Sequence, residues 1–264
     1  MVLRSRPTPC NAQGVSILMY HQIGPFPPMS THRSTYCHHR SFALQMLALR
    51  VLGIKVMAID EVLNYIKKGE VVCPLQRGGP LLKKTVSLTF DDGYENFFEY
   101  AYPVLRRHGF PATVYLISGY IGKDALWFRA DGRDTPPLMS RSRICGLLEH
   151  GLVTFGSHGV NHKKLAEIPR AEMAFEVRES KRQLEAMFVR PFNHFCYPYG
   201  SYDRTVLEEV KKAGFETAVT CVRGATYIGA DPYQLPRKAV SYGDSVLGFL
   251  WKIFFKNKRK NEEI

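Results

Sequence analysis

The feature of this sequence that most constrains its fold is a regular alternation of short apolar runs with longer amphipathic segments. The apolar runs predict strands at residues 15–20, 54–59, 85–90, 112–117, 152–156, 192–196, 215–220 and 235–240. The amphipathic segments predict helices at residues 41–52, 60–68, 95–108, 140–150, 170–188 and 202–213. Strands that alternate with helices in this way are typical of repeated βα units around a parallel sheet.

Seven or eight such units fit a single α/β domain. The chain has 264 residues, of which 45% are hydrophobic, and this suffices for one large core but not for a second full domain. We therefore expect a parallel (β/α) barrel at residues 15–242, preceded by an extension at 1–14 and followed by a basic amphipathic segment at 243–264. An open, doubly wound sheet has the same periodicity and is the alternative.

Charge and cysteine content exclude some classes of protein. The formal net charge of +12 attracts acidic polymers, nucleic acids and anionic lipids alike. The basic residues are spread along the chain, without a zinc-finger, Rossmann or P-loop pattern, so we expect no nucleic-acid partner. The six cysteines lie far apart and include no Cys-x-x-Cys pair, which disfavours both a structural zinc site and a disulfide framework.

The two ends of the sequence bear on its location. The first residues lack the apolar core of an export signal, and no stretch reaches the roughly 18 apolar residues of a membrane-spanning helix, so we expect a cytoplasmic protein. The run from Val246 to Phe255 is apolar and aromatic, and Lys256, Lys258, Arg259 and Lys260 follow it. This segment predicts either peripheral contact with an anionic membrane or a last helix packed on the core with a basic tail.

Paired carboxylates follow the predicted strand at 85–90. The stretch from Thr89 to Gly93 reads Thr-Phe-Asp-Asp-Gly, so Asp91 and Asp92 lie where the strand ends. Adjacent side chains can diverge where a strand passes into a loop, and one carboxylate can then bind a metal while the other transfers a proton. An ordinary Asp-Gly turn is the other interpretation of this stretch taken alone.

Two histidines follow the predicted strand at 152–156. His158 and His162 are four residues apart, a spacing that places two imidazoles on the same side of a helical turn. Together with Asp92 they would supply two nitrogens and one carboxylate oxygen, a ligand set typical of catalytic metal sites that leave a position open for water. Because both motifs follow strands, we expect them at the same face of a barrel.

A third motif, Tyr197-Pro198-Tyr199-Gly200, follows the predicted strand at 192–196. Proline, an aromatic residue and glycine favour a tight turn. The backbone N–H after the proline can point into a site as an oxyanion donor. A turn that only ends the strand is the alternative.

In combination and in this order, the three motifs resemble those of the NodB-like polysaccharide deacetylases, the fourth family of carbohydrate esterases. The resemblance covers residues 15–240 and implies a distorted parallel barrel that removes an N-acetyl, or less often an O-acetyl, group from a sugar with the help of a metal. It implies Asp91 as general base, Asp92, His158 and His162 as metal ligands, and the Tyr199 N–H as oxyanion donor. Such ligands accept zinc, which we expect first, and also cobalt, nickel or iron.

Three positions depart from the commonest pattern of that family. No histidine follows His194, so the late histidine that is the general acid in many members is absent. His21 resembles the acid of a permuted subgroup, the poly-β-1,6-N-acetylglucosamine deacetylases, and we predict it as general acid. Cys196 occupies the place of an arginine that orients the catalytic aspartate, and Arg237 is the candidate replacement. Gly159 replaces a Ser or Thr that braces the loop. An unrelated strand-end histidine and a surface arginine are the alternatives.

Two long connections, at residues 70–84 and 118–139, interrupt the βα pattern. Long loops in a compact domain are typically lids or binding loops. Trp127 and Phe128 make the second connection a candidate wall for stacking sugar rings, with Tyr197 and Tyr199 as further substrate contacts. Alternatively, this connection folds back over an exposed apolar face.

The sequence favours a metal-dependent deacetylase acting on an acetylated amino sugar in a polysaccharide, an oligosaccharide or a lipid-linked saccharide. Two other classes stay open. The missing late histidine and Cys196 are compatible with a carbohydrate-binding protein on a fold that has lost its activity. An amidohydrolase of a small non-sugar amide is the other, because barrel and metal do not by themselves select a substrate.

Overall fold

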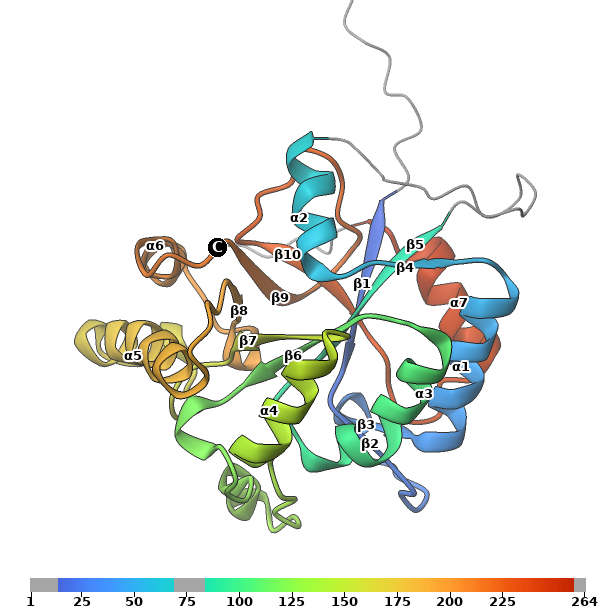
Figure 1. The fold of residues 1–264 in the computed structure, drawn as a ribbon, viewed down its shortest axis with the longest axis horizontal. Coiled ribbons are helices and arrows are strands. Elements are labelled where there is room, and N and C mark those ends of the chain that lie inside the picture. Colours follow the sequence, from blue (N-terminus) through green and yellow to red (C-terminus); the bar gives the residue numbers. More distant parts are fainter. Residues whose placement is uncertain (1–13, 69–83, 259–264) are drawn as a thin grey trace, which may run out of the picture.

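The computed structural model describes residues 14–68 and 84–258 and shows a closed parallel barrel surrounded by helices (Figure 1). Seven strands close the barrel in the order β1, β5, β6, β7, β8, β9, β10 and back to β1, and all of these pairings are parallel. Their bounds are Val15–Tyr20, Thr85–Phe90, Ala112–Leu116, Val153–Ser157, His194–Cys196, Thr217–Arg223 and Leu235–Ala239. The predicted barrel is therefore confirmed, with seven strands in the closed ring.

Helices cover the outside of this barrel. They are α1 (His39–Val51), α3 (Tyr102–His108), α4 (Arg141–His150), α5 (Arg170–Phe188), α6 (Arg204–Lys212) and α7 (Val246–Phe255). A π-helical turn, η2 (Phe97–Ala101), precedes α3, because Pro103 has no N–H to continue a regular ladder. Short 3₁₀ turns lie at η1 (Arg33–Thr35), η3 (Ser118–Tyr120), η4 (Leu126–Asp131), η5 (Leu165–Glu167) and η6 (Pro198–Gly200).

The predicted strand at 54–59 is mostly wrong. Only β4 (Lys55–Val56) is strand, and α2 (Ile59–Lys68) already begins at the end of the predicted range. The reason is that β5 shares one edge between two neighbours: β4 pairs with its first two residues and β6 with its last two. A further small sheet, β2 (Gln22–Gly24) with β3 (Tyr36–His38), was not predicted because strands of three residues give no periodicity.

Alternation along the strands separates an outer core from the barrel interior. Val86, Leu88 and Phe90 of β5 face outward into the apolar layer under the helices. Ser87 and Thr89 alternate with them and lead to Asp91 at the mouth of the barrel. Polar side chains thus already line the interior below the strand ends.

The opposite end of the barrel is closed by α2. Ile59, Val62 and Ile66 of this helix pack against interior residues such as Val15 and Leu235. In Figure 1 α2 lies at one end of the barrel and the β2–β3 pair at the other. Because this plug fills the amino end, only the carboxyl ends of the strands are available for a site.

Candidate active site

The carboxyl ends of the barrel strands bring the sequence motifs together. His21 follows β1 and Asp91 follows β5, and these strands pair in register with Tyr20 beside Phe90. Asp91 N–H also donates to Tyr20 O at 3.0 Å, which extends the ladder to the motif. Residues that are 70 positions apart in the chain are therefore neighbours in the site.

Arg237 holds Asp91 in place. Its Nη1 donates to Oδ1 at 2.7 Å and its Nη2 to Oδ2 at 2.8 Å, a bidentate pair between two buried side chains. Its Nε donates to Thr220 O at 2.8 Å and its Nη1 to Thr89 Oγ1 at 3.1 Å. Burial alone would raise the pKa of Asp91, but the charges of Arg237 and then His21 outweigh it and hold this pKa below its usual value. Asp91 is therefore ionised at neutral pH.

His21 lies on the other side of the same carboxylate. Its Nε2 is 3.7 Å from Asp91 Oδ2, and the side chain is 16% exposed at the mouth of the barrel. At the end of β8, the Cys196 thiol accepts a hydrogen bond from Arg237 Nη2 at 3.2 Å. The structure thus brings Arg237 from β10 to Asp91, and a small buried thiol fills the position at the end of β8.

Asp92, His158 and His162 converge on a second point. Asp92 Oδ1 is 3.4 Å from His158 Nε2 and 3.3 Å from His162 Nε2, longer than a well-formed hydrogen bond. Within the described residues this buried oxygen has no hydrogen-bond donor. Burial lowers the pKa of His162 to about 4, so its imidazole is neutral and keeps a lone pair at pH 7.

These three residues fit a divalent metal ion. Their ligand atoms all lie within 4.8 Å of one another, and all three side chains are buried. His158 Nδ1 lies 2.7 Å from Cys196 O, so we assign the proton to Nδ1, which leaves Nε2 for a metal. The Tyr94 hydroxyl donates to Asp92 Oδ2 at 2.7 Å and leaves Oδ1 toward the histidines.

Left-handed backbone conformations direct three side chains of the site. Asp92 has a φ of 72°, His162 of 56° and Tyr199 of 58°. Such conformations cost non-glycine residues of order 1–3 kcal/mol each and persist where the surroundings enforce them. At Asp92 the turn rotates its carboxylate away from that of Asp91, so the two acids face different partners.

A buried carboxylate on α5 braces the loop between the two histidines. Glu176 Oε2 accepts hydrogen bonds from the N–H groups of Val160 and Asn161, both at 2.8 Å, and Oε1 accepts from Asn161 Nδ2 at 2.7 Å. Gly159 in this loop has a φ of 79°, and a Cβ there would lie 3.1 Å from Glu176 Oε2. Glycine at 159 therefore accommodates a brace that comes from another helix.

The connection at 118–139 both covers an apolar face and reaches the site. Phe128 is buried and stacks on Tyr94 with ring centroids 6.4 Å apart, so the loop supports the residue that holds Asp92. Trp127 is only partly buried, and its ring lies 4.7 Å from that of His162. Phe128 therefore fits the interpretation that the loop folds back over an apolar face, while sugar stacking on Trp127 stays a prediction for a residue that the structure places beside His162. The predicted loop at 70–84 lies almost entirely outside the described residues.

Tyr199 and Tyr197 lie on opposite sides of the chain at η6. Tyr199 is 52% exposed, and the centroid of its ring lies 4.5 Å from that of the His162 ring. Tyr197 points away from the mouth: it is fully buried, stacks on Tyr202, and donates from its hydroxyl to Tyr233 O at 3.0 Å. The structure does not support a substrate contact for Tyr197, because this side chain belongs to the core under α5 and α6.

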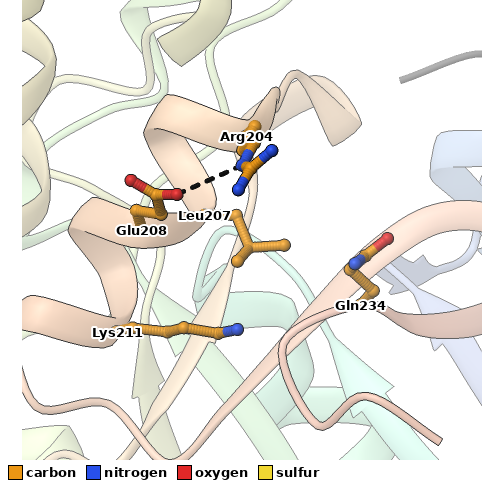
Figure 2. Close-up of a pocket in the computed structure, with 5 residues that line it drawn as sticks. All are labelled: Arg204, Leu207, Glu208, Lys211 and Gln234. Atoms are coloured by element: carbon orange, nitrogen blue, oxygen red, sulfur yellow. Dashed lines mark hydrogen bonds and ion pairs between the residues drawn. The ribbon is translucent and has the colours of Figure 1, made fainter.

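A surface hollow of about 330 Å³ lies apart from these residues (Figure 2). Four of its lining residues, Arg204, Leu207, Glu208 and Lys211, belong to α6, and Gln234 completes it. Arg204 pairs with Glu208, as the dashed line shows. None of the residues that converge at the barrel mouth lines this hollow.

Sequence reasoning missed two buried supports, Glu176 and Tyr94. Tyr94 directly follows the Asp-Asp-Gly stretch, and this position next to the motif could have identified it from the sequence. Glu176 lies in the middle of a long helix with a polar outer face, where a glutamate is expected to be exposed. Only the packing of α5 against the histidine loop identifies its role.

Comparisons with known proteins find similar sequences of one kind. A family model described as polysaccharide deacetylase matches residues 78–218. YxkH of Bacillus subtilis (strain 168) is 28% identical over 236 residues, 88% of this chain and 74% of that protein. The poly-beta-1,6-N-acetyl-D-glucosamine N-deacetylase of Staphylococcus aureus (strain MSSA476) is 26% identical over 208 residues, 76% of this chain and 66% of that protein.

Solved structures show the same fold. The Streptococcus pyogenes deacetylase PplD in complex with acetate has a TM-score of 0.76 at 22% identity, over 92% of this chain and 99% of that one. IcaB from Ammonifex degensii has a TM-score of 0.72 at 24% identity, over 91% of this chain and 97% of that one. Both likenesses extend well beyond the segment that the family model matches.

Proposed function

The chain belongs to the polysaccharide deacetylase family, and from this premise we propose that it is a metal-dependent hydrolase of N-acetyl groups on an amino-sugar glycan. The observation that carries the proposal is the convergence of Asp92, His158 and His162 beside an aspartate held by Arg237. A relative of this chain is named as a deacetylase of poly-β-1,6-N-acetyl-D-glucosamine, which supports an acetylated glucosamine polymer as the substrate class. O-acetyl groups are a chemically related, secondary substrate.

Asp92, His158 and His162 would hold the metal ion, for which we propose zinc, with cobalt, nickel or iron as other occupants. When bound, such an ion polarises a carbonyl and makes water more acidic. The residues of the chain then supply orientation and proton transfer. The Tyr94 hydrogen bond to Asp92 and the Glu176 brace of the histidine loop keep the three ligand atoms together before any ion enters.

Asp91 is the proposed general base. The fork of Arg237 fixes both of its oxygens and keeps it ionised, so it can accept a proton from water at neutral pH. His21, on the opposite side of this carboxylate, is the proposed acid that protonates the leaving amine. The deprotonated water attacks the acetyl carbonyl carbon, and collapse of the resulting tetrahedral intermediate breaks the C–N bond, so that acetate and the free amino sugar are released.

The rim of the site supplies the remaining proposed roles. The Tyr199 N–H, in a tight left-handed turn at the mouth, is the candidate donor to the oxyanion. The rings of Trp127 and Tyr199 flank that of His162 and are partly exposed, so they can stack on sugar rings beside the acetyl group.

Acetate release tests this function. Metal-reconstituted protein should release acetate from N-acetylglucosamine oligomers, and the isosteric Asp91→Asn variant should release at least about a hundredfold less. Binding of the oligomers without acetate above the Asp91→Asn level would instead indicate a carbohydrate-binding protein. Faster turnover of small acetamides than of oligomers would indicate an amidohydrolase with a non-sugar substrate.

A further inference from the structure

The outer face of α7 exposes large apolar side chains. Leu247, Trp251 and Phe255 follow one another at four-residue spacing and are 79%, 54% and 64% exposed. The opposite side of the helix buries Phe249 and Ile253 in the core. The helix is therefore firmly docked, and its outward stripe is available for a partner.

A neighbouring helix extends this apolar face. α1 packs beside α7 (Figure 1), and Gln45 of α1 donates to Asp244 O in the turn that precedes α7. Leu44, Leu47 and Val51 of α1 are 53%, 47% and 74% exposed. Both helices bury their inner sides in the same core cluster, so both stripes face outward on the same flank of the barrel. We call these six residues the α1–α7 face.

The two helices that form the α1–α7 face carry basic but no acidic side chains. Arg40 and Arg50 lie on α1, and Lys256 and Lys258 follow α7. A second copy of the chain would bring the same cations against them, since a twofold interface pairs identical surfaces. An anionic surface would meet both the apolar stripes and the flanking cations.

We propose that the α1–α7 face binds the surface of an anionic lipid bilayer. Apolar side chains would enter the boundary between headgroups and acyl chains, and the flanking cations would pair with anionic headgroups. Both helices lie along the side of the barrel in Figure 1, so the axis of the barrel would be parallel to the membrane surface. The mouth of the barrel would then face sideways along the membrane, and not toward the bilayer. No helix among the described residues is long and apolar enough to cross a membrane, so this contact is peripheral.

Vesicle sedimentation tests the contact. The full chain should sediment with vesicles of phosphatidylcholine and phosphatidylglycerol but not with phosphatidylcholine alone. Trp251→Ser should weaken this binding by about tenfold or more, and Lys256→Glu by about fivefold or more at low salt. The matched control is Phe175→Ser, because Phe175 is 51% exposed on α5, on another side of the barrel, and its loss should leave binding unchanged.

Tryptophan fluorescence gives a second readout. The chain has two tryptophans, so Trp127→Phe leaves Trp251 as the only one. Its emission should shift to the blue on anionic vesicles and be quenched by brominated acyl chains. The proposal would be overturned if the chain did not sediment with anionic vesicles. It would also be overturned if Trp251→Ser bound them as well as the native chain, or if Phe175→Ser lost as much binding as Trp251→Ser. So would a dimer in solution that Trp251→Ser dissociates.

Discussion

At the scale of residues, two adjacent aspartates have separate partners. The left-handed turn at Asp92 directs its carboxylate to the imidazoles, while Asp91 continues the inward row of β5 and meets Arg237. Both pKa values lie below the usual value, although burial opposes this in each case. Opposing charges are the cause: Arg237 for Asp91, and for Asp92 chiefly the protonated form of His162, which is present at the low pH where that carboxyl titrates.

Replacement of Arg237 should change both the pH profile and the stability. In Arg237→Met, burial of Asp91 is no longer opposed by the guanidinium, so its pKa should rise by about 1–3 units. The acidic limb of kcat/KM should move to higher pH by that amount, and the free energy of unfolding should fall by about 3–5 kcal/mol. Arg237→Lys, which keeps the charge without the fork, is the control and should lie in between.

The sign of the stability change follows from the lowered pKa of Asp91. Its folded-state pKa lies below 3.8, the value expected in the unfolded chain. The pair therefore stabilises the fold fully above pH 3.8, and this contribution is lost as the pH falls from there through the folded-state pKa. Urea titrations at pH 7 and below pH 3 measure it; equal losses for Arg237→Met at both pH values would contradict the ion pair.

Replacement of His21 should affect the leaving group selectively. If His21 protonates the departing amine, His21→Asn should lower kcat on N-acetylglucosamine oligomers by about 10²–10⁴-fold. Nitrophenyl acetate has a leaving group that needs no proton, so its hydrolysis should fall by less than about tenfold. A parallel loss on both substrates would show that His21 orients Asp91 and does not act as an acid.

At the scale of elements, sequence predicts regular segments well and short ones poorly. The predicted helix at 170–188 and the strands at 15–20 and 85–90 have the observed bounds, because their apolar periodicity is long and consistent. β4 has only two residues, since its length depends on which strand occupies the rest of the β5 edge. Such lengths are decided by tertiary pairing and have no local signal.

The same distinction applies to the candidate site. Asp91, Asp92, His158 and His162 are visible in the sequence because each pair is local and follows a strand. Glu176 is not, because it acts on Val160 and Asn161 from the middle of α5. In this chain the brace of the histidine loop comes from a carboxylate on a different element.

Loss of the Glu176 charge should loosen the histidine loop. Glu176→Gln keeps the size of the side chain but weakens two charge-assisted hydrogen bonds to backbone N–H groups, so metal affinity should fall by about 10–100-fold. Competition with a chromogenic chelator measures this affinity. Glu172→Gln, on the same helix in a partly buried pair with Lys163, is the control and should bind metal as the native chain does. Equal affinities in all three proteins would exclude the brace.

At the scale of the whole molecule, closure of the barrel determines the site. β1 lies between β5 and β10, so the first strand brings His21, the fifth Asp91 and the tenth Arg237 to one place. The alternation of strands and helices predicts parallel pairing but not this order, because an open sheet has the same local pattern. The order depends on contacts between strands about 70 and 220 residues apart in sequence.

Because the proposed metal ligands follow two different strands of the closed ring, metal binding should stabilise the entire fold. Asp92 follows β5 and His158 follows β7, so unfolding of the barrel separates them. An ion at about 100 times its Kd adds about 2.7 kcal/mol, which corresponds to an increase of roughly 5–10 °C in Tm for a chain of this size. Calorimetry with zinc and with a chelator measures the difference.

This stabilisation should depend on pH through the histidines. His162 must be neutral to bind a metal, and in the metal-free fold its pKa is about 4, below the 6.5 of the unfolded chain. Between pH 6.5 and pH 4 the unfolded state takes up a proton that the folded state does not, so the fold loses stability as the pH falls through this window. At His158, Cys196 and Asp92 raise the pKa despite burial, so protons compete with the ion for this ligand, and the increase in Tm with zinc should shrink from pH 7 to pH 5. The His162→Gln variant lacks one proposed ligand, so zinc should raise its Tm much less at pH 7 than it raises that of the native chain. If zinc raised the Tm of both proteins equally, the ion would have to bind elsewhere.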